Sequence, residues 1–77
     1  MNKIRRKELR KALELIDEAK SIIEACRDEE QEAFDNLPEG LQESERGEAI
    51  AECIYQMEDA MDSAESISDA LTEIVEG

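Results

Sequence analysis

The sequence has no histidine and no tryptophan, and it has one proline, three glycines and two cysteines. The absence of histidine excludes catalytic triads with an imidazole base, most zinc sites and the Glu-x-x-His di-iron motif. Phosphate-binding Gly-x-Gly and Gly-Lys-Ser loops are missing, and so is the pattern of acids and glycine that forms an EF-hand. We therefore expect a protein that is not an enzyme and that carries no cofactor and no metal.

Aromatic residues and long apolar runs are scarce as well. Phe34 and Tyr55 are the only aromatics among 77 residues, so the core of this single domain must be aliphatic and thin. No apolar run approaches the length that spans a membrane, and the basic residues 1–7 are not followed by the apolar stretch of a signal peptide. We expect a cytoplasmic protein.

The two cysteines lack the paired spacing of a metal knuckle, since Cys26 and Cys53 stand 27 positions apart. In the cytoplasm they should be reduced. Both fall on positions of the predicted core, so we expect two small buried thiols. A redox-sensitive disulfide is the alternative.

Charge of one sign dominates the chain, whose formal net charge is −13. Six basic residues within 1–11, set against Glu8, give this segment +5, so the other 66 residues carry −18. A body this acidic repels nucleic acid and anionic membranes, and its natural partners are basic proteins or cations.

A break runs from Asn36 to Gly47 and holds the only proline and two of the three glycines. Pro38 lacks a backbone donor and disfavours the α conformation of the residue before it, so a helix should end near residue 35. Gly40 tolerates positive φ, and Ser44 suits the N-cap of a following helix. The sequence predicts a helix over about 3–35, a turn over 36–44 and a second helix over about 45–76.

Apolar residues recur at heptad spacing through both predicted helices. The predicted core rows are Leu9, Ile16 and Ile23 with Ala12, Ala19, Cys26 and Ala33 in the first helix, and Ile50, Met57, Ala64 and Leu71 with Cys53, Ala60, Ile67 and Ile74 in the second. If the helices are antiparallel, the numbers of facing residues total 83, and those of Asn36 and Gly47 at the two ends of the break do so as well. The pattern predicts an all-α fold, an antiparallel two-helix hairpin similar to a coiled coil.

Seven further apolar residues fall at e and g positions of this heptad assignment, beside the predicted core. This partner stripe consists of Leu13, Leu15, Ile22, Phe34, Ile54, Met61 and Val75. Two helices cannot cover so wide an apolar surface, so a second copy or a different partner should. We expect a homodimeric four-helix bundle.

A row of acids follows the second helix at steps of three or four residues. This acidic row consists of Glu45, Glu48, Glu52, Asp59, Asp62, Glu65, Asp69, Glu73 and Glu76, with Tyr55 in its one gap. Such spacing sets carboxylates about 5–6 Å apart, which is comparable to the phosphate interval along a nucleic-acid strand. It predicts a nucleic-acid mimic with Tyr55 as its anchor, because tyrosine is enriched at binding hot spots. The alternative is a solvated face that keeps a small bundle dissolved.

Residues 36–48 read Asn-Leu-Pro-Glu-Gly-Leu-Gln-Glu-Ser-Glu-Arg-Gly-Glu. This resembles the turn of small acidic helical-hairpin proteins from bacteriophages and integrative elements of Gram-positive bacteria, Asn-hydrophobic-Pro-Glu-x-Leu-Gln-x-Ser-Glu-Arg-Gly-Glu, which a heptad-patterned acidic helix follows. The similarity covers the turn and much of the second helix, while the first helix matches only in character. The resemblance implies a mobile-element origin and a non-enzymatic role against a host defence system, and it supplies no site residues.

Two functions remain open at this point. The first is an inhibitor whose acidic row occupies the nucleic-acid-binding groove of a host defence nuclease, such as a CRISPR or restriction effector. The second is a structural or assembly module that dimerises, or zips onto a partner helix, through the partner stripe. Binding that weakens with salt indicates the first, and salt-tolerant association the second. In both cases the partner is a protein, with no direct contact to nucleic acid or membrane.

Overall fold

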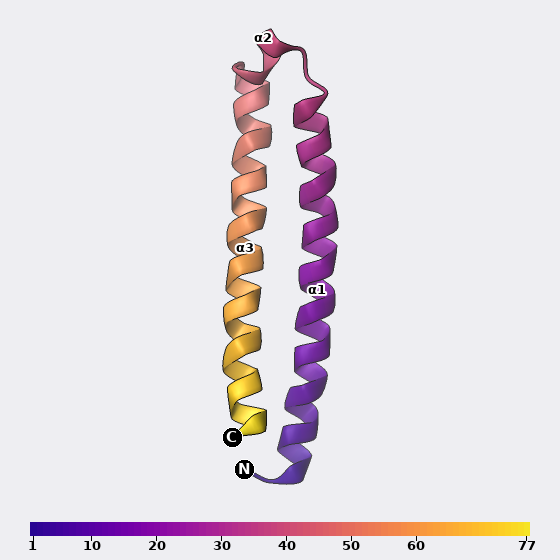
Figure 1. Ribbon diagram of the computed structural model, residues 1–77, viewed down its shortest axis with the longest axis vertical. Helices are drawn as coiled ribbons and strands as arrows, with labels where there is room; N and C mark the ends of the chain where they lie inside the picture. The colour runs from indigo at the N-terminus through magenta and orange to yellow at the C-terminus, as the bar shows by residue number, and fades with distance from the viewer.

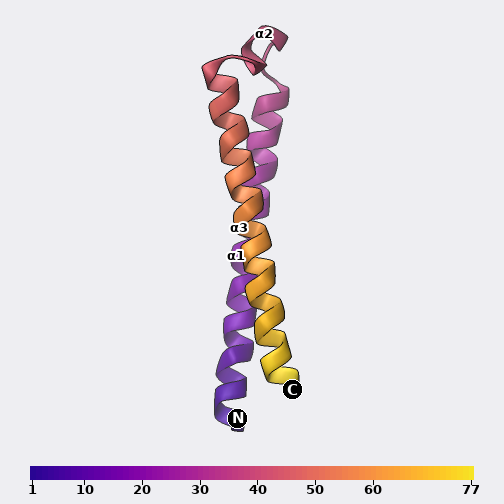
Figure 2. The ribbon, with the colours of Figure 1, turned by 90° about the vertical axis from the view of Figure 1, so that its left-hand side faces the viewer.

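The computed structural model describes residues 1–77 and is built from helices alone, with no strand. The elements in chain order are α1 (Lys3–Asp35), α2 (Glu39–Gln42) and α3 (Glu45–Glu76). The two long helices lie side by side, the chain reverses direction at α2, and both termini lie at the same end (Figure 1). The molecule is a rod of 58 × 14 × 13 Å, in which α1 and α3 cross at a shallow angle (Figure 2). The predicted all-α fold is confirmed.

Side-chain caps begin both long helices. The Asn2 side chain accepts a hydrogen bond from the backbone N–H of Arg5 at 2.8 Å, and this satisfies a free donor of the first turn of α1. Ser44 is the N-cap of α3, where its Oγ accepts from the N–H of Gly47 at 3.4 Å and donates to the carbonyl of Leu41. A cap of this kind contributes about 1 kcal/mol to helix stability.

The break between the long helices contains the short helix α2, which the sequence did not predict. No glycine in the chain has a positive φ, so the expected use of Gly40 as a left-handed turn residue is wrong. Gly47 is the position where the fold requires glycine. It is buried, and a Cβ there would collide with the carbonyl of Gln42 and lie 2.6 Å from the carbonyl oxygen of Leu41. The Gln42 amide also donates to the carbonyls of Phe34 at 3.3 Å and Leu37 at 3.4 Å. Thus α2 is held against both long helices.

The seam between α1 and α3 follows less exposed residues that recur at alternating steps of three and four. On α1 they are Leu9, Leu13, Ile16, Lys20, Ile23, Arg27, Glu30 and Phe34, and on α3 they are Gly47, Ile50, Ile54, Met57, Met61, Ala64, Ser68, Leu71 and Val75. Five other residues of these helices are also partly covered, namely Arg6, Ala12, Ala51, Glu58 and Thr72. One row of each helix is the predicted one. The other row lies one residue further along the chain than predicted, so Cys26, Cys53, Ile67 and Ile74 are exposed.

This displacement overturns most of the partner stripe. Five of its residues, namely Leu13, Phe34, Ile54, Met61 and Val75, lie in the seam and not outside it. Ile54 and Val75, at 7% and 6% exposed, are the most buried hydrophobic residues of the chain. Volume explains four of the five, since Leu13, Phe34, Ile54 and Met61 enter the seam in place of alanine or cysteine. At the end of α3 the shift replaces Ile67 by Ser68 and Ile74 by Val75, which volume does not explain. Leu15 and Ile22 alone remain outside, 58% and 59% exposed.

Lys20 and Arg27 made this arrangement hard to predict. Both occupy seam positions of α1 and are about one-third exposed or less, while their charged ends extend to acids of α3. Long basic side chains can cover apolar surface with their aliphatic stems in this way. The three polar contacts that join α1 to α3 link residues whose numbers total 85 and not 83. The register therefore differs from the predicted one by about one residue in each helix.

Candidate partner-binding surfaces

The outside of α3, opposite the seam, is acidic along its whole length. We call it the outer acidic face, and it consists of Glu45, Glu48, Glu52, Asp59, Asp62, Asp69, Glu73 and Glu76, with Tyr55 among them. All of these residues are exposed. One seam row of α3 consists of Gly47, Ile54, Met61, Ser68 and Val75, and the residues one position after or two positions before this row point away from α1. No lysine or arginine follows Arg46 in the chain, so no cation of α3 interrupts this face.

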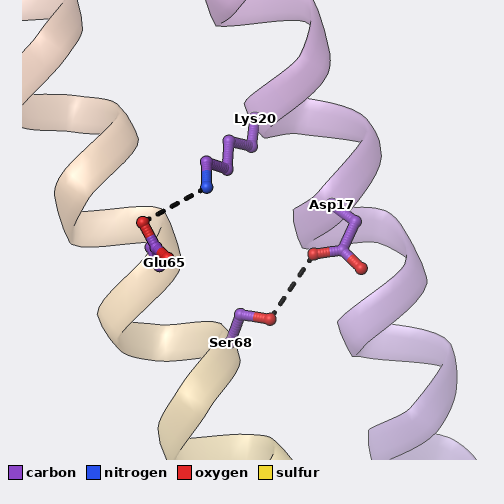
Figure 3. A network of polar contacts seen from close by, with 4 residues as sticks. All are labelled: Asp17, Lys20, Glu65 and Ser68. Atoms are coloured by element: carbon purple, nitrogen blue, oxygen red, sulfur yellow. Dashed lines mark hydrogen bonds and ion pairs between the residues drawn. The ribbon is translucent and has the colours of Figure 1, made fainter.

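Glu65 is the one member of the predicted acidic row that departs from this face. It lies beside the seam, where its Oε2 is 3.4 Å from Lys20 Nζ (Figure 3). Ser66 occupies the corresponding position of the outer acidic face, since it is seven residues after Asp59 and seven before Glu73. The spacing rule admitted Glu65 because a step of three fits as well as a step of four, whereas the structure distinguishes the two.

Tyr55 lies at the edge of the outer acidic face and is 66% exposed. It lines an open depression together with Phe34, Ala51 and Ile54, and Gln31 and Glu58 form the polar part of its rim. The aromatic ring therefore joins a row of carboxylates to a patch of accessible apolar surface. Such a junction suits a partner that offers both a cation and an apolar side chain.

One side of the seam, which we call the polar side, carries the contacts between α1 and α3. Besides the pair of Lys20 and Glu65, Arg27 Nη1 lies 3.6 Å from Glu58 Oε2. The hydroxyl of Ser68 donates to Asp17 Oδ1 at 3.4 Å (Figure 3). These groups are partly exposed, so each pair contributes about 0–1 kcal/mol and serves mainly to fix the register.

The opposite side of the seam has a different character, and we call it the uncharged side. Cys26 and Cys53 line one depression at the end of this side toward the turn, together with Glu29, Glu30, Gln56 and Met57. This places the rows that contain the cysteines on the same side by helix periodicity. These rows and their neighbours supply Ala12, Leu15, Ala19, Ile22 and Cys26 from α1, and Cys53, Ala60, Ile67 and Ile74 from α3. Leu15, Ile22, Ile67 and Ile74 are 45–59% exposed. The helix positions that face this side between 12 and 26 and between 53 and 74 hold no charged residue.

Both cysteines are free and exposed, so the expectation of buried thiols is wrong. They fall one position outside the seam because the larger Arg27 and Ile54 occupy the neighbouring seam positions. No three acidic or cysteine side chains come together in a way that could hold a metal ion.

The basic segment 1–11 lies at the end of the rod where the chain begins and ends (Figure 1). None of the three ion pairs of the structure involves it. Its positive charge is therefore not matched by a direct contact within one copy.

No protein-family model, no curated protein and no solved structure matches the chain. None of the three helices combines the length and the apolar character that crossing a membrane requires. The surfaces described above are thus the observations from which a function can be argued.

Proposed function

We propose that this chain is a helical hairpin that acts by protein–protein contact, and that its outer acidic face binds the basic groove of a nucleic-acid-binding protein. The observation that carries the proposal is the unbroken sign of that face. Its eight carboxylates are all exposed and no cation follows Arg46. At 1.5 Å per residue, the face extends over about 45 Å from Glu45 to Glu76, enough to follow a groove that holds several nucleotides.

The energetics of such a contact are those of charge complementarity. A chain of net charge −13 is attracted to a positive groove over distances beyond direct contact, which raises the rate of association. Tyr55 adds a contact of another kind, since its exposed ring lies beside accessible apolar surface. A host defence nuclease such as a CRISPR or restriction effector is the partner that the resemblance of the turn favours.

The test is capture of proteins from a bacterial lysate on the immobilised chain. Bound proteins should be nucleic-acid-binding, should be displaced by added DNA, and should be lost between about 50 mM and 200 mM salt. Proteins that stay bound in high salt and ignore DNA would contradict the proposal.

A second candidate is an assembly module that pairs through the uncharged side. The specific observation in its favour is that Leu15, Ile22, Ile67 and Ile74 stand on one side of the rod with about half of their surface accessible. Association through this side should tolerate salt, because it removes apolar area from water and pairs few charges.

A further inference from the structure

The uncharged side plays no part in binding a basic groove, since it lies beside the seam while the outer acidic face lies opposite the seam. We propose that a second copy of this chain covers the uncharged side, and that the two copies lie antiparallel, with their turns at opposite ends of a four-helix bundle. This inference does not depend on the proposed basic partner.

One copy buries little of its own apolar surface. Ile54 and Val75 are the only hydrophobic residues with less than a tenth of their surface exposed, although the chain is 40% hydrophobic. Small domains with so thin a core are commonly completed by oligomerisation. The uncharged side is where large aliphatic side chains remain accessible together.

The area of this side limits what a second copy can cover without contact to charged residues. The whole face of the rod, 58 Å long and about 14 Å wide, is roughly 800 Å², which is the share of one partner in an interface of standard size. Its charge-free part, about 32 Å long from Cys53 to Ile74, is roughly 450 Å², so an interface of standard size also includes the charged ends of the rod. On α1, the positions that face this side from Ala12 to Cys26 hold no charged residue, and Glu29 and Glu30 follow at the end toward the turn. The alanines on it allow helices to approach closely, and the leucine and isoleucines fill the space between them.

The residues of the uncharged side are arranged with twofold symmetry. On α1, Ala12 and Cys26 each stand seven residues from Ala19, and Leu15 and Ile22 stand four and three residues from it. A twofold axis across the rod sets each helix antiparallel to its own copy, so Ala19 would meet the partner's Ala19.

A similar arrangement occurs on α3, although its centre lies about 4 Å along the rod from the level of Ala19. There Ala60 and Ile67 are symmetric about the bond between Ser63 and Ala64, and so are Cys53 and Ile74. An antiparallel copy therefore sets a small residue opposite a large one twice in each half of the interface. Such pairing is what interdigitated packing needs.

Charge selects the same orientation. The turn end, residues 28–48, has nine acids and one arginine and so carries −8, whereas residues 1–11 with residues 66–77 at the other end carry +2. A parallel pair would bring the two acidic ends together. An antiparallel pair sets the basic segment of each copy, which makes no ion pair of its own, beside the acidic end of the other.

Sedimentation equilibrium of the whole chain tests the partner. We expect a dimer at micromolar concentration, and a dissociation constant at least about 100-fold higher for Ile22→Glu and for Ile67→Glu, because each would bury two unpaired carboxylates in the dimer. Ala25→Glu is the control, since Ala25 is exposed, lies away from the uncharged side and is outside the two charged ends of the rod. Helicity by circular dichroism should be unchanged in all three. A monomeric wild-type chain with full helicity, or a dimer that survives both substitutions, would overturn the inference.

Disulfide cross-linking tests the orientation. In the antiparallel pair the cysteine introduced by Ala12→Cys stands level with the partner's Cys26, so the double variant Ala12→Cys, Cys53→Ser should oxidise to a covalent dimer joined between these two positions. The wild-type chain should not, because its own Cys26 lies about 20 Å along the axis from the partner's Cys26. In a parallel pair, α1 faces the partner's α3, and the two cysteines of the double variant have no cysteine of the partner opposite them. A double variant that sediments as a dimer but forms no covalent dimer on oxidation would refute the antiparallel arrangement.

Discussion

Lys20 reaches across the seam to Glu65, with its Nζ 3.4 Å from the carboxylate Oε2, while its aliphatic stem fills a place between Ile16 and Ile23. A lysine thus serves as a seam residue, and its charge is satisfied on the polar side. The consequence is that the two sides of the seam differ, because one is held by ion pairs and the other has no charged residue at its facing positions between 12 and 26 and between 53 and 74.

Reversing this lysine should weaken the fold. Lys20→Glu would set a second carboxylate beside Glu65 and shorten the stem over the seam, so we expect a loss of about 1–2 kcal/mol in the free energy of unfolding. Lys11→Glu is the matched control, because Lys11 is exposed and makes no ion pair. Urea denaturation of the two variants should show the larger loss for Lys20→Glu. Equal losses would mean that net charge alone matters.

The two glycines of the turn region should respond in opposite ways to alanine. Gly47→Ala must push α2 away from α3, so it should cost about 1–3 kcal/mol even though alanine favours a helix. Gly40→Ala has no atom within 4 Å of the new Cβ and no positive φ, so it should be neutral or stabilise by about 0.4–1 kcal/mol. Thermal melting followed by circular dichroism checks both. A stable Gly47→Ala would contradict the close packing of α2.

The displaced seam row can be tested with a pair of isoleucines. Ile54→Ala should lower the free energy of unfolding by about 2–5 kcal/mol at any protein concentration, because Ile54 is buried within one copy. Ile67→Ala should matter little in a dilute, monomeric sample and more as the dimer forms, because Ile67 is 51% exposed in one copy. Urea denaturation over a range of protein concentrations distinguishes the two variants. Equal losses of unfolding free energy at every concentration would support the seam row predicted from the sequence, in which Ile67 is a core residue.

The outer acidic face should be needed for binding a basic partner. Reversal of Asp62, Asp69 and Glu73 to lysine should abolish capture of that partner and leave the chain helical, since all three point to solvent. Reversal of Glu14, Glu18 and Glu32 is the control, because it makes the same change of net charge on exposed positions of α1. If both triple variants bind alike, the attraction is one of net charge and the face has no specific role.

Tyr55→Ala offers a finer measure of the same contact. The substitution removes packing and leaves every charge in place, so it should raise the dissociation constant about tenfold or more without altering its salt dependence. A changed salt slope would show that the ring acts by placing charges and not by packing.

The all-α fold and one row of each helix followed from the sequence because heptad spacing of Leu9, Ile16 and Ile23, and of Ile50, Met57 and Leu71, has a single helical interpretation. The second row could not be chosen in this way. Moving it by one residue exchanges alanines and cysteines for larger residues, but it also brings in Lys20 and Arg27, which a search for apolar residues rejects. Only the reach of those side chains to Glu65 and Glu58 shows why charged residues are accepted there.

The sequence predicted the surfaces in part only. Acids at regular steps could be assigned to the outside of α3 from spacing alone, yet Glu65 required knowledge of what stands across the seam. The sequence pattern does not predict the uncharged side, because it assigns Ile67 and Ile74 to the core. Its signal is present in the sequence as a lack of charge at two neighbouring heptad positions of both helices.

The chain begins and ends at one end of the rod, with the turn at the other end and the rod 58 Å long (Figure 1). Anything joined to either terminus therefore stands at the pole opposite the turn. In the antiparallel pair, labels on the two N-termini would be held apart by about the length of the rod, and in a parallel pair they would be neighbours. An antiparallel pair would therefore hold its two attachment points about one helix length apart.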